Sequence, residues 1–208
     1  MKKIIFIIVF VVTAGVSAQT KYEKGMTKAF ALWQENKTTE AGQLFERISK
    51  AETDKWLPPY YAALIEITGS FGIKNESELI AKLNKAQEFL DTAKSLSPNN
   101  PEILITQAFL HVGYMAFDGQ KYGMTMSMKN NALYGKAFAI APNNPRVILS
   151  KAEADMGAAR FFGKPITPYC KDVEKAIALA KEEKITTKFY PKFMFSRAEE
   201  ILKQCAKK

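Results

Sequence analysis

The chain has 208 residues, of which 47% are hydrophobic and 25% are charged, and its formal net charge at pH 7 is +9. This composition is ordinary for a globular protein with one core or one short solenoid. Basic residues are mixed with glutamates along the chain and no block of five like charges occurs, which predicts a solvated surface and argues against nucleic-acid binding.

The first residues have the pattern of a secretory signal peptide. Lys2 and Lys3 precede an unbroken apolar run over residues 4–12, and small residues follow up to Ala18. The apolar run is too short to cross a membrane comfortably, because a spanning helix needs about 20 residues. We therefore expect cleavage after Ala18, which would lower the net charge to +7 through the loss of the two lysines. The mature protein would be periplasmic or secreted, with no membrane span.

The rest of the chain predicts helices throughout. Apolar residues recur at spacings of three and four, as in amphipathic helices, and no segment alternates like a half-buried strand for more than a few residues. The first two helices are joined by a tight turn at residues 36–39. In chain order, we expect helices over residues 22–37, 40–51, 60–68, 75 or 77 to 96, 102–116, 130–140, 147–160, 169–183 and 191–207. A methionine-rich entry at residues 124–128 leads into the helix that ends at residue 140.

A repeated motif separates the helices in the middle of the chain. The sequence SPNNP at residues 97–101 occurs again as APNNP at residues 141–145. Proline cannot continue the preceding helix, the asparagines tolerate turn geometry, and the second proline suits the first position of the next helix. The helix-opening prolines are Pro59, Pro101, Pro145 and Pro191, at spacings of 42, 44 and 46 residues. This period predicts four antiparallel helix pairs and a closing helix.

Aromatic and glycine residues mark the connections within the later pairs. Because these connections join equivalent helix ends, we expect them to project from one edge of the stack. Exposed aromatic side chains there would anchor a partner, whereas the alternative is that the rings fold back over the helix ends. The aromatic residues of this rim are Phe71, Phe117, Tyr122, Phe161 and Phe162.

The residues around the two motifs resemble tetratricopeptide repeats. The match is carried by Ala86, Leu90, Ala93 and Pro98, and again by Tyr134, Ala137 and Pro142. The repeats here are elongated, at about 42–46 residues instead of about 34. The resemblance implies that residues 19–208 form a single domain, a right-handed α-solenoid of four helix pairs with a C-terminal capping helix. It also implies a concave surface that binds protein segments, and no catalysis.

By that resemblance, the first helices of the later pairs line a concave groove. Its mixture of apolar and charged residues suits a bound peptide or helix, and the alternative is a partly solvated helix face without a ligand. We expect an exported scaffold for a protein or peptide partner; the alternative function is a small-ligand or carbohydrate-binding module that uses the loop aromatics. The predicted groove residues are Glu102, Ile105, Phe109, Val112, Arg146, Leu149, Glu153 and Met156.

The chain contains two cysteines, Cys170 and Cys205. The first lies near the start of one predicted helix and the second near the end of the next, antiparallel helix, so the two are about equally far from the turn between them. An exported protein can form a disulfide. We therefore expect these cysteines to pair, and the alternative is two separately buried thiols.

Few residues in the chain are suited to catalysis or metal binding. His111 is the only histidine, and no glycine-rich phosphate loop is present. Thioethers such as those of Met115, Met124, Met126 and Met128 can bind Cu(I), but methionine more often fills gaps near loops. We therefore expect no enzymatic activity, no metal site and no cofactor.

Overall fold

A computed structural model describes residues 21–206, and all of the regular secondary structure in this range is helical. The prediction of an all-α chain is therefore confirmed, while the predicted signal peptide lies outside the described residues. A helical segment over residues 21–34 is followed by α2 (Thr38–Ala51), α3 (Leu57–Thr68), α4 (Glu76–Leu96), α5 (Pro101–Phe117), α6 (Gly119–Ile140), α7 (Pro145–Phe161), the 3-10 helix η1 (Thr167–Tyr169), α8 (Cys170–Glu182) and α9 (Phe195–Cys205).

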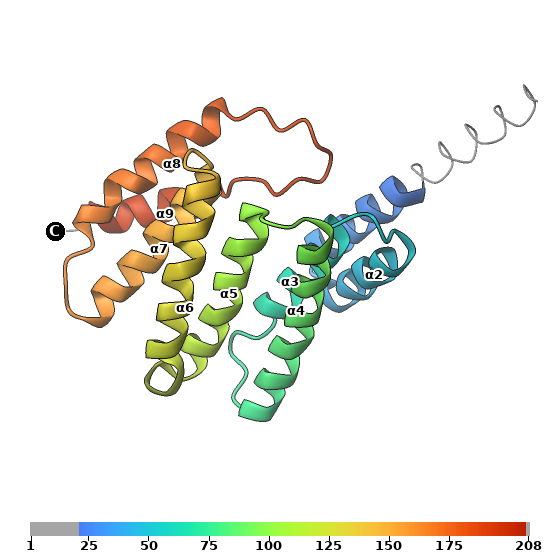
Figure 1. Ribbon diagram of the computed structural model, residues 1–208, viewed down its shortest axis with the longest axis horizontal. Coiled ribbons are helices and arrows are strands. Elements are labelled where there is room, and N and C mark those ends of the chain that lie inside the picture. Colours follow the sequence, from blue (N-terminus) through green and yellow to red (C-terminus); the bar gives the residue numbers. More distant parts are fainter. Residues whose placement is uncertain (1–20, 207–208) are drawn as a thin grey trace, which may run out of the picture.

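Neighbouring helices pack against each other in pairs. Helix α3 packs against α4, α5 against α6, and α7 against α8, while α3 also packs against α2. The pairs touch because α3 contacts α5 and α5 contacts α7. Figure 1 shows the pairs following one another from the blue N-terminal helices to the orange C-terminal ones. The helices α3, α5 and α7 therefore form one row, and they line the cavity described below.

The two copies of the repeated motif act as helix starts, as predicted. Pro101 and Pro145 occupy the first turns of α5 and α7. The side chain of Asn100 accepts a hydrogen bond from the backbone N–H of Glu102, and that of Asn144 accepts one from Arg146, both at 2.9 Å. These asparagines are N-caps, which satisfy backbone donors that have no partner within the helix.

The connection between α5 and α6 differs from the prediction. We expected a loop over residues 117–123, but Asp118 alone separates the two helices. The Asp118 side chain accepts hydrogen bonds from the backbone N–H groups of Gln120 and Lys121, at 3.0 and 2.9 Å. Because this cap starts α6 at once, the extra length of this pair lies in the helix, and Tyr122 is helical.

The last helix also begins later than predicted. It starts at Phe195 instead of near Pro191, and residues 183–194 form a long irregular segment that we call the strap. Figure 1 shows the strap looping from the end of α8 toward α3 and returning to α9. The reason is packing: the Phe189 ring stacks on Phe30 of the N-terminal helix, with ring centres 5.7 Å apart. This distant contact takes the segment out of any helix.

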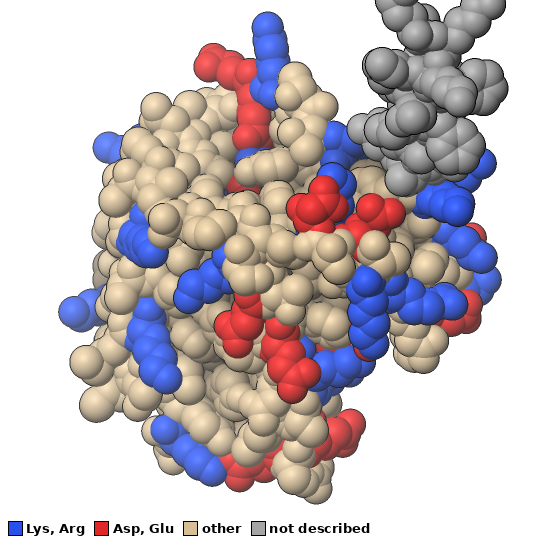
Figure 2. Space-filling model, turned by 45° about the vertical axis from the view of Figure 1, so that its right-hand side comes forward, with Lys and Arg blue, Asp and Glu red and all other residues tan. Residues whose placement is uncertain are grey.

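The predicted disulfide between Cys170 and Cys205 is present. It joins the start of α8 to the end of α9, and the two Cα atoms are 6.1 Å apart. The bond closes the C-terminal hairpin of helices below the strap. None of the described helices is long and apolar enough to cross a membrane. On the face seen in Figure 2, basic and acidic side chains are interspersed, as the charge pattern predicted.

Candidate ligand-binding cavity

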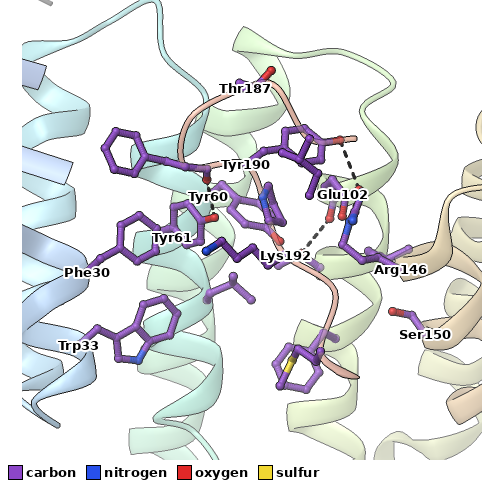
Figure 3. Close-up of a pocket in the computed structure, with 18 of the residues that line it drawn as sticks. Phe30, Trp33, Tyr60, Tyr61, Glu102, Arg146, Ser150, Thr187, Tyr190 and Lys192 are labelled. Atoms are coloured by element: carbon purple, nitrogen blue, oxygen red, sulfur yellow. Dashed lines mark hydrogen bonds and ion pairs between the residues drawn. The ribbon is translucent and has the colours of Figure 1, made fainter. Parts of the chain in front are cut away.

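A cavity of about 910 Å³ lies between the row of first helices and the strap. Its walls come from the N-terminal helix, α3, α5 and α7, and the strap contributes residues that cross it, as Figure 3 shows. Small-molecule sites commonly have volumes of about 300–1,000 Å³. The cavity is therefore large enough for a bulky organic ligand.

Aromatic rings form the wall of the cavity at its N-terminal end. Phe30 lies edge-on to Tyr61 with ring centres 4.7 Å apart, and Trp33 lies edge-on to Tyr61 at 6.2 Å. The Phe189 ring of the strap stacks on Phe30 and extends this group of rings. Such rings offer large apolar faces to a flat ligand. Aliphatic side chains continue the wall along α3, α5 and α7, namely Leu64, Ile105 and Leu149.

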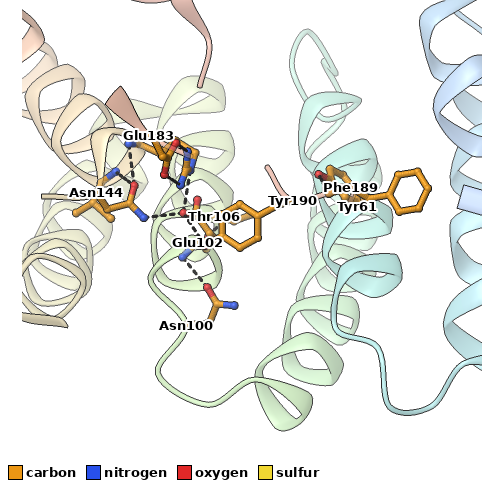
Figure 4. A network of polar contacts seen from close by, with 10 residues as sticks. Tyr61, Asn100, Glu102, Thr106, Asn144, Glu183, Phe189 and Tyr190 are labelled. Carbon is orange, nitrogen blue, oxygen red and sulfur yellow. Dashed lines mark hydrogen bonds and ion pairs between the residues drawn. The ribbon is translucent and has the colours of Figure 1, made fainter. Parts of the chain in front are cut away.

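A buried group of charged residues lies at the other end of the cavity (Figure 4). Arg146 of α7 donates from Nε to Glu102 of α5 at 2.9 Å. Its two terminal nitrogens donate to the two carboxylate oxygens of Glu183, at 2.6 and 2.7 Å. Glu183 directly follows α8 and is the first residue of the strap. One guanidinium thus holds two carboxylates, which leaves the group with a formal charge of −1.

Glu102 is the most deeply buried member of this group, with no exposed surface. Its Oε1 atom also accepts hydrogen bonds from Asn144, at 2.7 Å, and from the Tyr190 hydroxyl, at 3.3 Å. Its Oε2 atom has no hydrogen-bond partner within the described part of the chain. Asn144 is therefore both the cap of α7 and a support for the buried carboxylate.

The surroundings of the site shift the pKa values of its arginine and of its tyrosines. Burial lowers the pKa of the Arg146 guanidinium, but the hydrogen bonds to Glu183 and the charge of Glu102 outweigh this effect and raise its pKa overall. Burial raises the pKa of Tyr190 to about 12, with the Glu102 charge as a further cause. Burial also raises the pKa of Tyr60 and of Tyr61. The arginine is thus charged and the tyrosines are neutral at physiological pH.

Four polar contacts hold the strap over the cavity. Besides the Arg146–Glu183 pair, the Tyr61 hydroxyl donates to the backbone carbonyl of Phe189 at 2.7 Å. Lys188 pairs with Glu23 of the N-terminal helix at 2.7 Å, and the Tyr190 hydroxyl donates to Glu102. The Tyr190 ring also lies 5.2 Å from the Arg146 guanidinium. The strap is thus tied to both ends of the cavity.

Cationic side chains lie along the strap side of the cavity. Arg197 pairs with Glu153 at 2.7 Å, and Lys188 pairs with Glu23 as described above. Lys192 is exposed and forms no ion pair with any residue in the range 21–206. Within that range no histidine or cysteine lines the cavity, and no cluster of three or more histidine, cysteine or acidic residues is placed to hold a metal ion.

Comparison with known proteins shows a likeness of fold. No protein-family model and no curated protein sequence matches the chain. The structure resembles that of the HusA haemophore from Porphyromonas gingivalis, with a TM-score of 0.77 and 21% sequence identity. The matched region covers 89% of this chain and 92% of that chain. At this identity the likeness establishes a shared fold.

The structure brings most of the predicted groove residues to one place. Glu102, Ile105, Phe109, Arg146, Leu149 and Glu153 all line the cavity. Val112 and Met156 are not among its lining residues, and Met156 is buried in the C-terminal core, because α8 and α9 cover that side of α7. Glu102 and Arg146 are buried and bound to each other, whereas the groove prediction placed them as open contact residues.

The predicted aromatic rim is divided between exposed and packed rings, and none of its residues lines the cavity. Phe161 and Phe162 are 73% and 68% exposed, and Phe71 is 41% exposed. Phe117 packs against the N-terminal core. Tyr122 lies beside Tyr114, with ring centres 5.2 Å apart, and hydrogen-bonds to Glu76. Phe161 and Phe162 therefore have the exposed environment that the anchor prediction requires, whereas Phe117 follows the packed alternative.

Two parts of the cavity were missed by the sequence reasoning. These are the rings of the N-terminal helix, Phe30 and Trp33, and the strap itself. The strap had a signal in the sequence, because residues 188–193 read KFYPKF and combine three aromatic rings with a proline that interrupts a helix. A segment so rich in aromatic residues and outside a helix is a candidate for long-range packing.

Proposed function

We propose that this protein binds a flat, largely apolar small molecule that carries carboxylates, in the class of haem and other porphyrins. The observation that carries the proposal is the cavity of about 910 Å³ with aromatic walls, in a fold like that of a haemophore. This is the ligand-binding alternative of the sequence analysis, but the aromatic rings involved are those of the cavity instead of the loop rim. The protein would bind without catalysis.

The chemistry of the cavity suits the two parts of a porphyrin. The macrocycle is apolar and flat, and its burial against Phe30, Trp33 and Leu64 would be favourable by about 25 cal/mol for each Å² of apolar surface removed from water. The propionate carboxylates need a cation, which Lys192 on the strap side supplies. Both requirements are met within one cavity.

A titration with haem tests this function. Trp33 lines the cavity, so bound haem is expected to quench tryptophan fluorescence and to shift the haem absorbance band in a saturable way. Leu64→Glu places an unpaired charge in the apolar wall and is expected to weaken binding at least about tenfold. Phe162→Glu is the matched control, because Phe162 is exposed outside the cavity. Absence of saturable binding at micromolar haem would overturn the proposal.

We also infer where the protein works and how its repeats are built. The Cys170–Cys205 disulfide supports a compartment outside the reducing cytoplasm, which agrees with the signal-peptide pattern of residues 1–18 and a periplasmic or secreted protein. The helix pairs are elongated tetratricopeptide-like repeats in this proposal, supported by the motif at the starts of α5 and α7.

A second candidate function is the binding of a protein partner at the exposed part of the rim. The observation that favours it is the exposure of Phe161 and Phe162 at the end of α7, since large apolar side chains in water often mark an interaction site. Crosslinking of the native protein tests it. Partners lost in a Phe161→Ser and Phe162→Ser variant that still binds haem would support this function, and partners retained in that variant would refute it.

A further inference from the structure

We propose that Arg146 is the receptor for a ligand carboxylate, and that Glu183 of the strap occupies this receptor in the ligand-free protein. The inference rests on the proposed function and specifies it, because it names one residue and one chemical group of the ligand. It assigns a role to the strap as well: the first residue of the strap acts as an internal substitute for the ligand.

The geometry of Arg146 is that of a carboxylate site already filled. Its two terminal nitrogens bind both oxygens of Glu183 at 2.6 and 2.7 Å, a bidentate arrangement that arginine forms with carboxylates in general. Arg146 lines the cavity and is 8% exposed. A ligand carboxylate that reached the same two nitrogens would find the same hydrogen bonds.

The two carboxylates on Arg146 differ in how firmly they are held. Glu102 is fully buried on α5 and is also bound by Asn144 and Tyr190, so it is a fixed part of the wall. The Glu183 side chain is 24% exposed, lies beyond the end of α8, and has hydrogen bonds to Arg146 alone within the described chain. Glu183 is therefore the partner that can leave.

The exchange conserves the ionic balance of the buried group. When a ligand carboxylate replaces Glu183, Arg146 keeps two anionic partners and the formal charge of the group stays at −1. Glu183 returns to water, so no carboxylate is left buried without a cation, which is the arrangement that costs most. Burial of the apolar part of the ligand against the aromatic wall then makes the free energy of binding favourable overall.

The exchange also loosens the strap at one end. Glu183 begins the strap, so its release from Arg146 would free the part of the strap that directly follows α8, while Tyr190 stays bound to Glu102. The other end would stay tied through the hydrogen bond from Tyr61 to the Phe189 carbonyl. The strap would then open at its Glu183 end and admit the ligand beside α7.

The decisive measurement compares protoporphyrin IX with its dimethyl ester, which has the same macrocycle and no free carboxylate. Affinities are measured by tryptophan quenching in the wild type, in Glu183→Gln, and in the control Glu182→Gln, whose side chain is exposed at the end of α8. Wild-type protein is expected to prefer the diacid by at least about tenfold, because a bidentate charged pair is lost with the ester.

Glu183→Gln is expected to bind the diacid several-fold more tightly than the wild type and the ester unchanged, because the internal competitor is weakened. Glu182→Gln should resemble the wild type with both probes. Arg146→Lys, which keeps the charge but loses the planar fork, should reduce the preference for the diacid. Trypsin cleavage after the exposed Lys184 should be faster in Glu183→Gln than in Glu182→Gln.

The outcomes separate this inference from the proposed function. If the diacid and the ester bind the wild type equally well, porphyrin binding stands and Arg146 is not the receptor. If Glu183→Gln binds the diacid more weakly, the Glu183 side chain stabilises the site instead of competing for it, which also overturns the inference. If neither probe binds, the proposed function fails and this inference fails with it.

Discussion

Glu102 and Arg146 occupy the same position in two copies of one motif, and their side chains bind each other. Each residue directly follows the second proline of a Pro-Asn-Asn-Pro sequence, and Arg146 Nε lies 2.9 Å from Glu102 Oε1. The repeat thus places opposite charges at equivalent sites, 44 residues apart, and the packing of α7 on α5 joins them. This pair is the fixed part of the ionic group in the cavity.

For this reason, substitution of Arg146 should lower the free energy of unfolding. Arg146→Met leaves the Glu102 carboxylate buried without a cation, and the loss of one partner of a buried pair typically destabilises by about 3–5 kcal/mol. The double variant Arg146→Met with Glu102→Gln should recover a large part of the loss, because the buried charge is gone. Urea unfolding measures both. If the single and double variants were equally stable, the unpaired Glu102 carboxylate would not be the cause of the destabilisation.

The two capping asparagines provide a matched pair of variants. Asn100→Ala removes an N-cap from α5 and should destabilise by about 1 kcal/mol. Asn144→Ala removes the equivalent cap from α7 and also the 2.7 Å hydrogen bond to buried Glu102, so it should cost about 1.5–3 kcal/mol more. Chemical denaturation of the two variants checks the difference. Equal losses would show that Asn144 contributes nothing to Glu102.

The hydrogen bond from Tyr61 to the strap can be removed with little other change. Tyr61→Phe keeps the ring in the aromatic wall and deletes the bond to the Phe189 carbonyl. We expect a loss of about 1 kcal/mol in the free energy of unfolding and faster trypsin cleavage after Lys188. Tyr169→Phe, a ring with no hydroxyl contact to other described residues, is the control. Unchanged cleavage at Lys188 would argue that other contacts alone hold the strap.

Local signals in the sequence predicted much of the fold. Pro101, Pro145 and their asparagines mark helix starts through interactions within four residues, and the Cys170–Cys205 pairing followed from helix lengths and one turn. Such features depend on near neighbours in the chain, so a sequence pattern is enough to find them. The position of Asp118 as a cap is also local, but the glycines around it suggested a loop.

The cavity itself depends on contacts between distant parts of the chain. Phe30 and Phe189 stack although more than 150 residues separate them, and Lys188 and Glu23 are 165 positions apart. Nothing in the helical spacing near residue 30 indicates such a partner. The groove prediction located Glu102 and Arg146, but burial of both charges could be known only once α5 and α7 were packed together.

The stability of the protein should depend on pH through His111. Its Nδ1 lies 2.6 Å from Asn130 Oδ1, and burial lowers the pKa of the ring, an effect that this hydrogen bond opposes. Because the unfolded chain binds the proton more readily, stability is full above the unfolded pKa of about 6.5 and is lost as pH falls toward the lower folded pKa. Denaturation of wild type and His111→Gln between pH 7.5 and 5 should show a steeper decline in the wild type. Parallel curves would contradict this.

Phe189 combines an unusual backbone with a ring in the cavity wall. Its φ of 62° lies in the left-handed region, which costs a bulky residue about 1–2 kcal/mol and costs glycine almost nothing. Phe189→Ala and Phe189→Gly both remove the ring that stacks on Phe30, so both should lose stability and porphyrin affinity.

The two variants differ only in how well residue 189 tolerates its positive φ. Alanine keeps the unfavourable φ, whereas glycine relieves it, so Phe189→Gly should be the more stable of the two by about 1 kcal/mol despite the greater freedom of glycine in the unfolded chain. At positions with a negative φ, the alanine variant is expected to be more stable than the glycine variant. Urea unfolding of both proteins gives the sign directly, and Lys192→Ala against Lys192→Gly on the same strap supplies the ordinary case. If alanine is the more stable residue at position 189 too, the backbone at this position does not carry the strain that its positive φ implies.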